Sequence, residues 1–170
     1  MADDELWDLT DADGAPLGRL QRRGDAMPAG VFHIVASVCV VRGDGLVLMT
    51  RRAAIKDWPL AWEFPAGSAL AGESSAETAA RELAEEAGVR VSPDDLALVG
   101  RVTEASALFD LYVAHVDGDP SLELDPLEVC ESEWVTLEEA FRRGARGEMA
   151  GPWVNRLDDL GVLLARAVSR

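Results

Sequence analysis

Three glutamates are spaced so that they share one side of a predicted helix. Glu82, Glu85 and Glu86 stand at i, i+3 and i+4, and residues at these spacings are neighbours on a helix surface. Crowded carboxylates repel one another and raise the pKa of at least one of them, unless a cation lies between them. Carboxylate oxygens suit Mg2+ or Mn2+, and these ions often also take phosphate oxygens as ligands. The spacing therefore favours a divalent-metal site that acts on a phosphate-containing molecule.

Capping residues mark the ends of this helix. Ser74 and Glu77 form a capping-box pattern, which predicts that the helix begins near Ser75. Gly88 is a typical residue after the last helical turn, so we expect the helix to end near Ala87. Its apolar side is almost all alanine, which lets the helix approach a sheet closely and hold the carboxylates rigidly, while we expect the carboxylates to face solvent. The apolar positions are Ala76, Ala79, Ala80, Leu83, Ala84 and Ala87.

An alternative interpretation is a solvated acidic helix surface without a metal. In that case Arg81 would form i,i+4 ion pairs with Glu77 and Glu85. The residues before the glutamates argue against this interpretation, because five residues separate Gly67 from Glu73 and seven separate Glu73 from Arg81.

Residues 67–89 read GSALAGESSAETAARELAEEAGV. This segment resembles the Nudix box, G-x5-E-x7-R-E-U-x-E-E-x-G-U with U an aliphatic residue, and every fixed position matches. The resemblance implies Mg2+-dependent cleavage of a diphosphate bond, with Mn2+ as the alternative ion. It also implies roles for particular residues: Glu85 and Glu86 as metal ligands, Glu82 as a ligand or the base that activates water, the carbonyl of Ala66 as another ligand, and Arg81 and Glu73 as the residues that orient these carboxylates.

The resemblance extends well beyond this segment, over roughly residues 5–145. Residues 46–52, 58–67 and 133–139 look like the usual surroundings of a Nudix box. The opening, from Trp7 through Gly24 to His33, is similar to a branch that contains isopentenyl diphosphate isomerases and hydrolases resembling them. The fold that this implies is a Nudix-type α/β/α sandwich with a mixed central sheet and an N-terminal β-hairpin.

Two other functions compete with hydrolysis. An isomerase of this branch needs a cysteine and a histidine around the first box glycine, where this chain has Ala66 and Ser68. Of the isomerase's metal-binding histidines only His33 has a counterpart, and Ala26 stands where another would be. The other alternative is a noncatalytic ligand-sensing domain, but such domains usually lose glutamates that are intact here.

The remaining candidate residues lie outside the box. Arg51 and Arg52 follow a predicted strand, and we expect one of them to bind phosphate while the other faces solvent or pairs with Asp57. Glu128 lies in a loop that often supplies this family with another metal-binding carboxylate, with Glu131 as its competitor. Trp62 is predicted to belong to the core, and the role of Trp58 is left open.

The rest of the chain is organised as one α/β domain with an N-terminal addition. Residues 1–30 are predicted to form a hairpin and a linker, and residues 31–170 a single globular unit. Residues 32–41 form a continuous apolar run, so we expect a strand buried on both faces. Further strands are expected at 46–50, 96–101, 108–116 and 132–136, and helices at 137–143 and 152–168.

Composition excludes several classes of partner. The net charge of −15 argues against nucleic acid and anionic membrane surfaces, but a metal and local arginines still allow a small diphosphate substrate. The group attached to the diphosphate stays open between a nucleoside, a sugar, a prenyl chain and a cofactor. Two cysteines give no disulfide framework, and the acidic opening lacks the features of a signal peptide, so we expect a cytoplasmic protein. The hairpin and the last helix are expected to pack either on the core or on a second subunit, which makes a homodimer one alternative.

Overall fold

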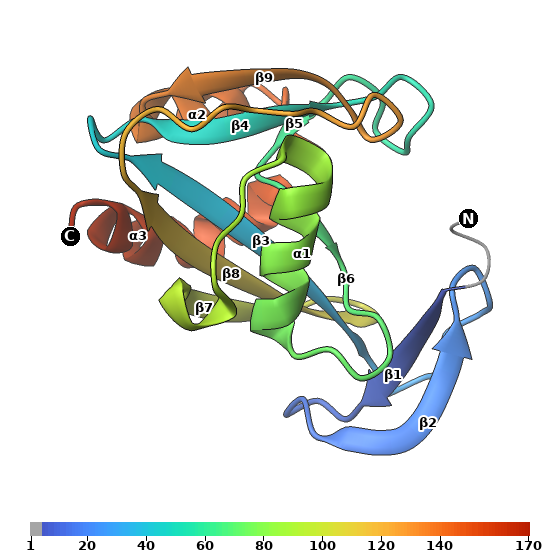
Figure 1. The fold of residues 1–170 in the computed structure, drawn as a ribbon. Helices are drawn as coiled ribbons and strands as arrows, with labels where there is room; N and C mark the ends of the chain where they lie inside the picture. The colour runs from blue at the N-terminus through green and yellow to red at the C-terminus, as the bar shows by residue number, and fades with distance from the viewer. Residues whose placement is uncertain (1–4) are drawn as a thin grey trace.

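A mixed sheet forms the centre of the molecule in the computed structural model, which describes residues 5–170. Residues 1–4, which belong to the acidic opening and to the predicted hairpin and linker region, lie outside the described part. The strand order is β5-β4-β3-β8-β7, with β6 also pairing with β3 and β9 with β4 (Figure 1). The parallel pair β3–β8 lies in the middle, and the other pairs are antiparallel. The bounds are β3 His33–Arg42, β4 Val47–Arg52, β5 Trp62–Glu63, β6 Ala66–Ser68, β7 Ala97–Thr103, β8 Ala107–Val116 and β9 Val129–Val135.

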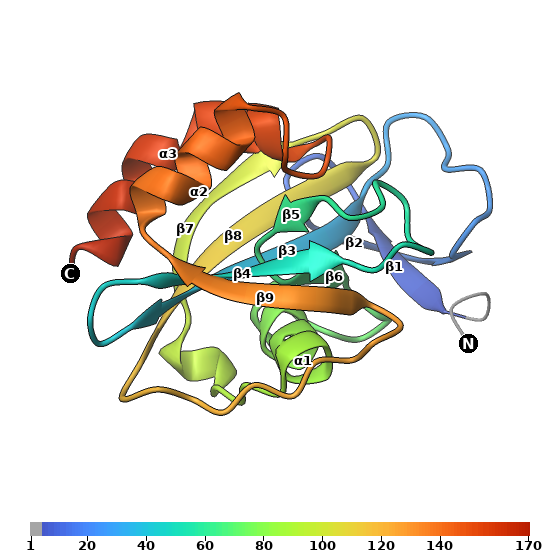
Figure 2. The same cartoon turned by 90° about the horizontal axis from the view of Figure 1, so that it is seen from above.

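Helices cover both faces of this sheet. Helix α1 (Ser75–Ala87) lies on one face, and α2 (Leu137–Ala145) and α3 (Trp153–Val168) lie on the other (Figure 2). A short 3-10 helix, η2 (Pro93–Asp95), follows α1. The arrangement is a three-layer α/β/α sandwich, which confirms the predicted fold class.

Strand β3 shows why the sheet is buried on both sides. Its alternate residues Ala36, Val38 and Val40 pack in the core under α1, whereas Cys39 and Val41 pack in the core under α2 and α3. Successive side chains of a strand point to opposite faces, so a strand buried on both faces has a continuous apolar sequence. The predictions of a doubly buried strand and of Cys39 as a core residue are both confirmed.

The N-terminal hairpin forms a separate two-stranded sheet, β1 (Leu6–Thr10) and β2 (Pro16–Arg22). It packs on the main domain through Trp7, whose ring stacks on that of His33 with centroids 4.1 Å apart. The backbone N–H of Ala71 also donates to the carbonyl of Leu6 over 2.8 Å. The predicted hairpin is confirmed, and these contacts hold it beside the loop that precedes α1.

The last strand differs from its prediction. Strand β9 begins at Val129 rather than near residue 132, because it pairs with β4 from Val47 as far as Arg52. The predicted helix at 152–168 is confirmed as α3. Within residues 5–170, none of the helices is long and apolar enough to cross a membrane.

Candidate functional site

The ends of α1 follow the predicted capping pattern. Ser74 Oγ accepts from the N–H of Glu77 at 3.2 Å, and Glu77 Oε2 accepts from the N–H of Ser74 at 2.7 Å. Gly88 closes the helix in the left-handed conformation, with φ 73°. Both predicted helix ends are therefore confirmed, and they fix the rotation of the glutamates relative to the sheet.

The three glutamates of α1 are buried to different degrees, which corrects the expectation of a solvated carboxylate face. The side chains of Glu85 and Glu82 are 58% and 15% exposed, and Glu86 is only 5% exposed. The segment after β8 packs across the end of the helix, where the N–H of Asp125 donates to the carbonyl of Glu86. This contact joins the segment around Asp125 to the last turn of the helix, beside Glu86.

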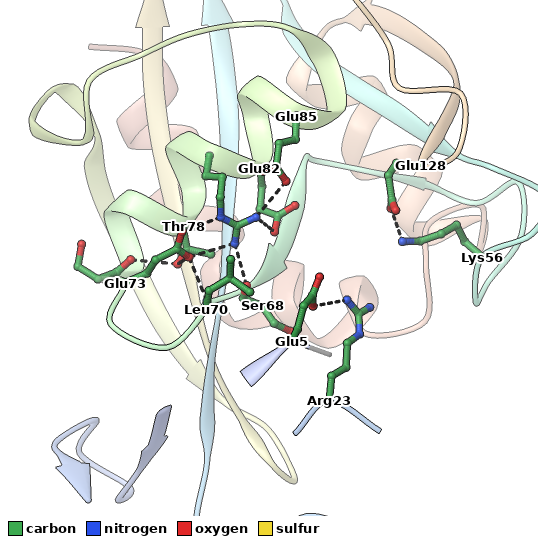
Figure 3. A network of polar contacts seen from close by, with 12 residues as sticks. Glu5, Arg23, Lys56, Ser68, Leu70, Glu73, Thr78, Glu82, Glu85 and Glu128 are labelled. Atoms are coloured by element: carbon green, nitrogen blue, oxygen red, sulfur yellow. Dashed lines mark hydrogen bonds and ion pairs between the residues drawn. The ribbon is translucent and has the colours of Figure 1, made fainter. Parts of the chain in front are cut away.

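Arg81 connects the helix to the loop before it. Its guanidinium donates to Glu73 Oε1 at 2.7 Å and to Glu82 Oε1 at 2.7 Å. It also donates to Glu85 Oε2 at 3.1 Å and to the carbonyl of Ser68 at 3.0 Å (Figure 3). Glu77 is used for capping instead, so the alternative Glu77–Arg81 ion pair does not form. An arginine fork with this many acceptors fixes the carboxylate of Glu82 in one orientation.

Glu86 is the most strongly perturbed carboxylate of the group. Burial raises its pKa well above the usual value, and the negative charges of Glu63, Glu82 and Glu128 raise it further. Its Oε2 atom is buried and has no hydrogen-bond partner. A buried carboxylate oxygen without a partner costs free energy, and a cation placed between these carboxylates would remove that cost.

A cavity of about 390 Å³ lies beside these carboxylates. Glu82, Glu85 and Glu86 line it from α1, Glu63 lines it from β5, and Glu128 lines it from the segment before β9. Ala66 and Gly67 of β6 also border the cavity. In the part of the chain that the structure describes, no three carboxylate, histidine or cysteine side chains are already gathered as a metal-binding group. Glu82 is paired with Arg81, and Glu128 is paired with Lys56.

The two candidate arginines lie in different places. Arg52 lines the cavity, donating to Glu63 Oε1 at 2.7 Å and to the backbone carbonyl of Asp57 at 2.6 Å. Arg51 lines a separate pocket, where it pairs with Glu131 at 2.9 Å. Successive residues of a strand point to opposite faces, so only one of the two reaches the carboxylates. Glu131 was the alternative to Glu128 as a metal-binding carboxylate. It lines the separate pocket with Arg51 and not the cavity.

The two candidate tryptophans also lie in different environments. Trp62 is 8% exposed and belongs to the core cluster under α2 and α3, as predicted. Trp58 is about half exposed and lines the cavity. Its backbone has a left-handed φ of 48°, and that of nearby Leu60 has a φ of 61°. Both values are unusual for residues with a side chain.

Several cavity residues were missed by reasoning from the sequence. Glu63 lies within the segment 58–67 that resembles the approach to the box, so that segment was a usable signal. Arg156 of α3 carried no such signal. It is buried with its guanidinium 3.7 Å from the ring centre of Phe109, and it pairs with Glu104 at 2.6 Å. Further charged cavity residues that were missed include Lys56, Asp125, Glu5 and Arg23.

Comparison with known protein families identifies the family to which this chain belongs. The model of the NUDIX domain matches residues 31–156. The chain belongs to the Nudix family. The matched region contains the whole of α1 and every cavity carboxylate except Glu5.

The relatives of this chain include two kinds of Nudix protein. It is 33% identical over 152 residues to an uncharacterized Nudix hydrolase of Listeria monocytogenes, lmo0368, covering 85% of this chain and 87% of the relative. It is 29% identical over 153 residues to an isopentenyl-diphosphate Delta-isomerase of Escherichia coli, covering 85% and 82%. The crystal structure of DR0079 from Deinococcus radiodurans superposes with a TM-score of 0.74 at 22% identity, covering 92% of this chain and 99% of that one. The sandwich with its N-terminal hairpin is thus a Nudix fold.

Proposed function

We propose that this Nudix protein is a Mg2+-dependent hydrolase that cleaves a diphosphate bond in a nucleoside diphosphate derivative or a similar small diphosphate. The observation that carries the proposal is the buried Oε2 of Glu86, which has no partner and faces the negative charges of three other carboxylates. Such an arrangement is costly for a merely structural glutamate. It suits a residue that binds a cation.

The residues present fit a divalent metal. Glu85 and Glu86 would hold Mg2+ or Mn2+ together with the backbone carbonyl of Ala66, and Glu82 and Glu128 are the further candidate ligands. All of these residues line the same cavity, and carboxylate and carbonyl oxygens are the ligands that Mg2+ prefers. When bound, the metal would neutralise charge on the phosphate oxygens and lower the pKa of the attacking water.

Glu82 is the proposed general base. Burial raises its pKa, and the charges of Glu85 and Glu128 add to that effect while Arg81 opposes it. A carboxylate with a raised pKa is a better proton acceptor at neutral pH. Arg81 holds this carboxylate through a hydrogen bond of 2.7 Å, and Glu73 holds Arg81 in turn. Glu82 would therefore accept the proton of the water that attacks phosphorus.

Arg52 is the arginine that we propose for phosphate binding, since it lines the cavity and Arg51 does not. A cavity of about 390 Å³ is within the usual size range for small-molecule sites. The pairing of Arg52 with Glu63 leaves other donors of its guanidinium for substrate, because arginine carries several N–H groups.

Isomerisation is the second candidate, because an isopentenyl-diphosphate isomerase is among the relatives. The chain has Ala66 and Ser68 on either side of Gly67, so it lacks the cysteine–histidine pair expected for moving a proton along a carbon skeleton. A noncatalytic sensor would not need the intact set of box glutamates. Both alternatives are therefore weaker than hydrolysis.

A panel of diphosphates tests the proposal. The purified protein is incubated with Mg2+ and nucleoside, sugar, prenyl and cofactor diphosphates, and phosphate-containing products are measured with and without EDTA. We expect metal-dependent products from at least one compound. Calorimetry should show weak Mg2+ binding that strengthens when a diphosphate is present. Absence of divalent binding under both conditions would refute the metal site.

A further inference from the structure

The N-terminal hairpin contributes a cation to the cavity. Arg23, directly after β2, lines the cavity together with Glu5, and the two side chains form an ion pair of 2.7 Å. In the view of Figure 3 this pair lies between Ser68 and the Lys56–Glu128 pair. Both hairpin residues lie outside the segment 31–156 that the NUDIX model matches. They are thus an addition to the common domain that reaches the candidate site.

The position of Arg23 is fixed by contacts that do not involve its side chain. Its backbone N–H donates to the carbonyl of Glu5 over 2.9 Å. In the middle of β1, Asp8 Oδ2 accepts from the N–H of Gly72 over 2.6 Å. These bonds add to the stacking of Trp7 on His33. The guanidinium is therefore presented from an anchored backbone, and its side chain pairs with Glu5.

Arg23 has the most exposed side chain of the cations that line the cavity. Its side chain is 42% exposed and its partner Glu5 is 34% exposed. The other cations that line the cavity are between 9% and 24% exposed and are held by carboxylates of the main domain. Exposed ion pairs contribute little stability, so breaking one costs little. The less exposed cations of the cavity are Arg52, Lys56, Arg81 and Arg156.

We propose that Arg23 is a substrate-binding residue, which leaves Glu5 and donates to nonbridging oxygens of the substrate's diphosphate. The planar guanidinium matches the geometry of phosphate oxygens. The diphosphate would therefore replace the carboxylate of Glu5 as a charged acceptor that offers two oxygens to Arg23. Glu5 then acts as a competitor that occupies Arg23 until a diphosphate arrives. The inference rests on the proposed function, because it takes the substrate to be a diphosphate held beside the box carboxylates.

Two substitutions with opposite expected effects test this role. Arg23→Gln should raise the KM for the best diphosphate of the panel about tenfold and leave kcat within about twofold, since a charge-assisted contact to substrate is lost. Glu5→Gln removes the competitor and should lower KM about two- to fivefold. Arg19→Gln removes the same charge from β2 outside the cavity and should leave KM unchanged.

A purely structural ion pair predicts a different pattern. If the pair only holds the hairpin in place, Arg23→Gln and Glu5→Gln would change KM in the same direction, and that result would overturn the proposal. A direct binding measurement separates this question from the proposed function. In Mg2+, the Kd for methylenediphosphonate, which cannot be hydrolysed, should rise about tenfold in Arg23→Gln whether or not the wild type turns over any diphosphate. An unchanged Kd would contradict a role of Arg23 in binding.

Discussion

Gly67 leaves the space that the carboxylate of Glu82 occupies. A methyl group on Gly67 would come within 2.1 Å of Glu82 Oε1, and Glu82 has little freedom to move because Arg81 holds it. The first glycine of the box is thus linked directly to the proposed general base. Its role is the close approach of the β6 backbone to a side chain of α1.

Gly67→Ala should reduce kcat by about a hundredfold, because it displaces Glu82 from its working geometry. The folded state should survive, with a loss of about 1–3 kcal/mol, typical of one overpacked methyl group. Gly43→Ala is the matched control, since a methyl group there would meet no atom within 4 Å. Steady-state kinetics and thermal unfolding of both variants check the prediction. Wild-type kcat in Gly67→Ala would show that Glu82 tolerates displacement.

Glu86→Gln should stabilise the metal-free protein. The charge of Glu86 is disfavoured by burial and by its carboxylate neighbours, and the amide removes that charge at nearly the same volume. A gain of about 1 kcal/mol would raise the melting temperature by about 2–4 °C in a chain of this size. The same variant should lose the rise in Tm that Mg2+ gives the wild type, together with hydrolysis.

The matched control for this stability measurement is Glu85→Gln, which changes the same charge on the solvent-exposed part of the helix. Its metal-free Tm should stay close to that of the wild type. Scanning calorimetry in EDTA and in Mg2+ distinguishes the variants. A metal-free Glu86→Gln protein that melts below the wild type would mean that the carboxylate has a stabilising partner in the fold.

His33 should make the protein less stable in mild acid. Burial lowers the pKa of His33 below 6.5 and Arg23 lowers it further, while the hydrogen bond to Ser106 and the charge of Glu104 oppose the shift. Below pH 6.5 the unfolded chain therefore binds a proton that the folded chain resists, and stability falls as pH falls. The slope from this single group is at most about 1.4 kcal/mol per pH unit.

The comparison that checks this prediction uses His33→Gln, which should lose stability less steeply between pH 7 and pH 5. His115→Gln, at the exposed end of β8, is the control for general effects of removing a histidine. Urea unfolding at each pH gives the free energies. Equal slopes for the wild type and His33→Gln would show that His33 does not titrate differently on folding.

Isopentenyl diphosphate should not be isomerised. Ala66 and Ser68 carry no group that can add a proton to a carbon–carbon double bond or remove one from the neighbouring carbon. The measurement is exchange of label from deuterated water into isopentenyl diphosphate in the presence of Mg2+. Exchange that persists after a contaminating isomerase has been excluded would overturn the hydrolase assignment.

The parts of the site that were predictable depend on local sequence. The cap at Ser74, the left-handed Gly88 and the spacing of the glutamates are set within a few residues of one another, so they could be read directly. The burial of Glu86 is instead a property of tertiary packing, in which segments from far along the chain, such as the one around Asp125, contact the helix. Periodicity along the helix does not contain that information.

The choice between Arg51 and Arg52 likewise could not be predicted from local sequence. Alternation along a strand implies that neighbours point to opposite faces, so one of the two was expected near phosphate. The choice between them depends on the pairing of β4 with β5 and β9, and pairing is a long-range property. Arg23 and Arg156 reach the cavity from the hairpin and from α3, and nothing near them in sequence signals this.

The central claim, that water attacks phosphorus, is tested most directly by hydrolysis in 18O-labelled water. The substrate is whichever diphosphate of the panel turns over fastest, and the products are analysed by mass spectrometry. The account predicts one 18O atom in a phosphate-containing product, an intact C–O bond in the organic part, and a rate that depends on Mg2+. Label found only in an organic alcohol would mean attack at carbon and would contradict the account.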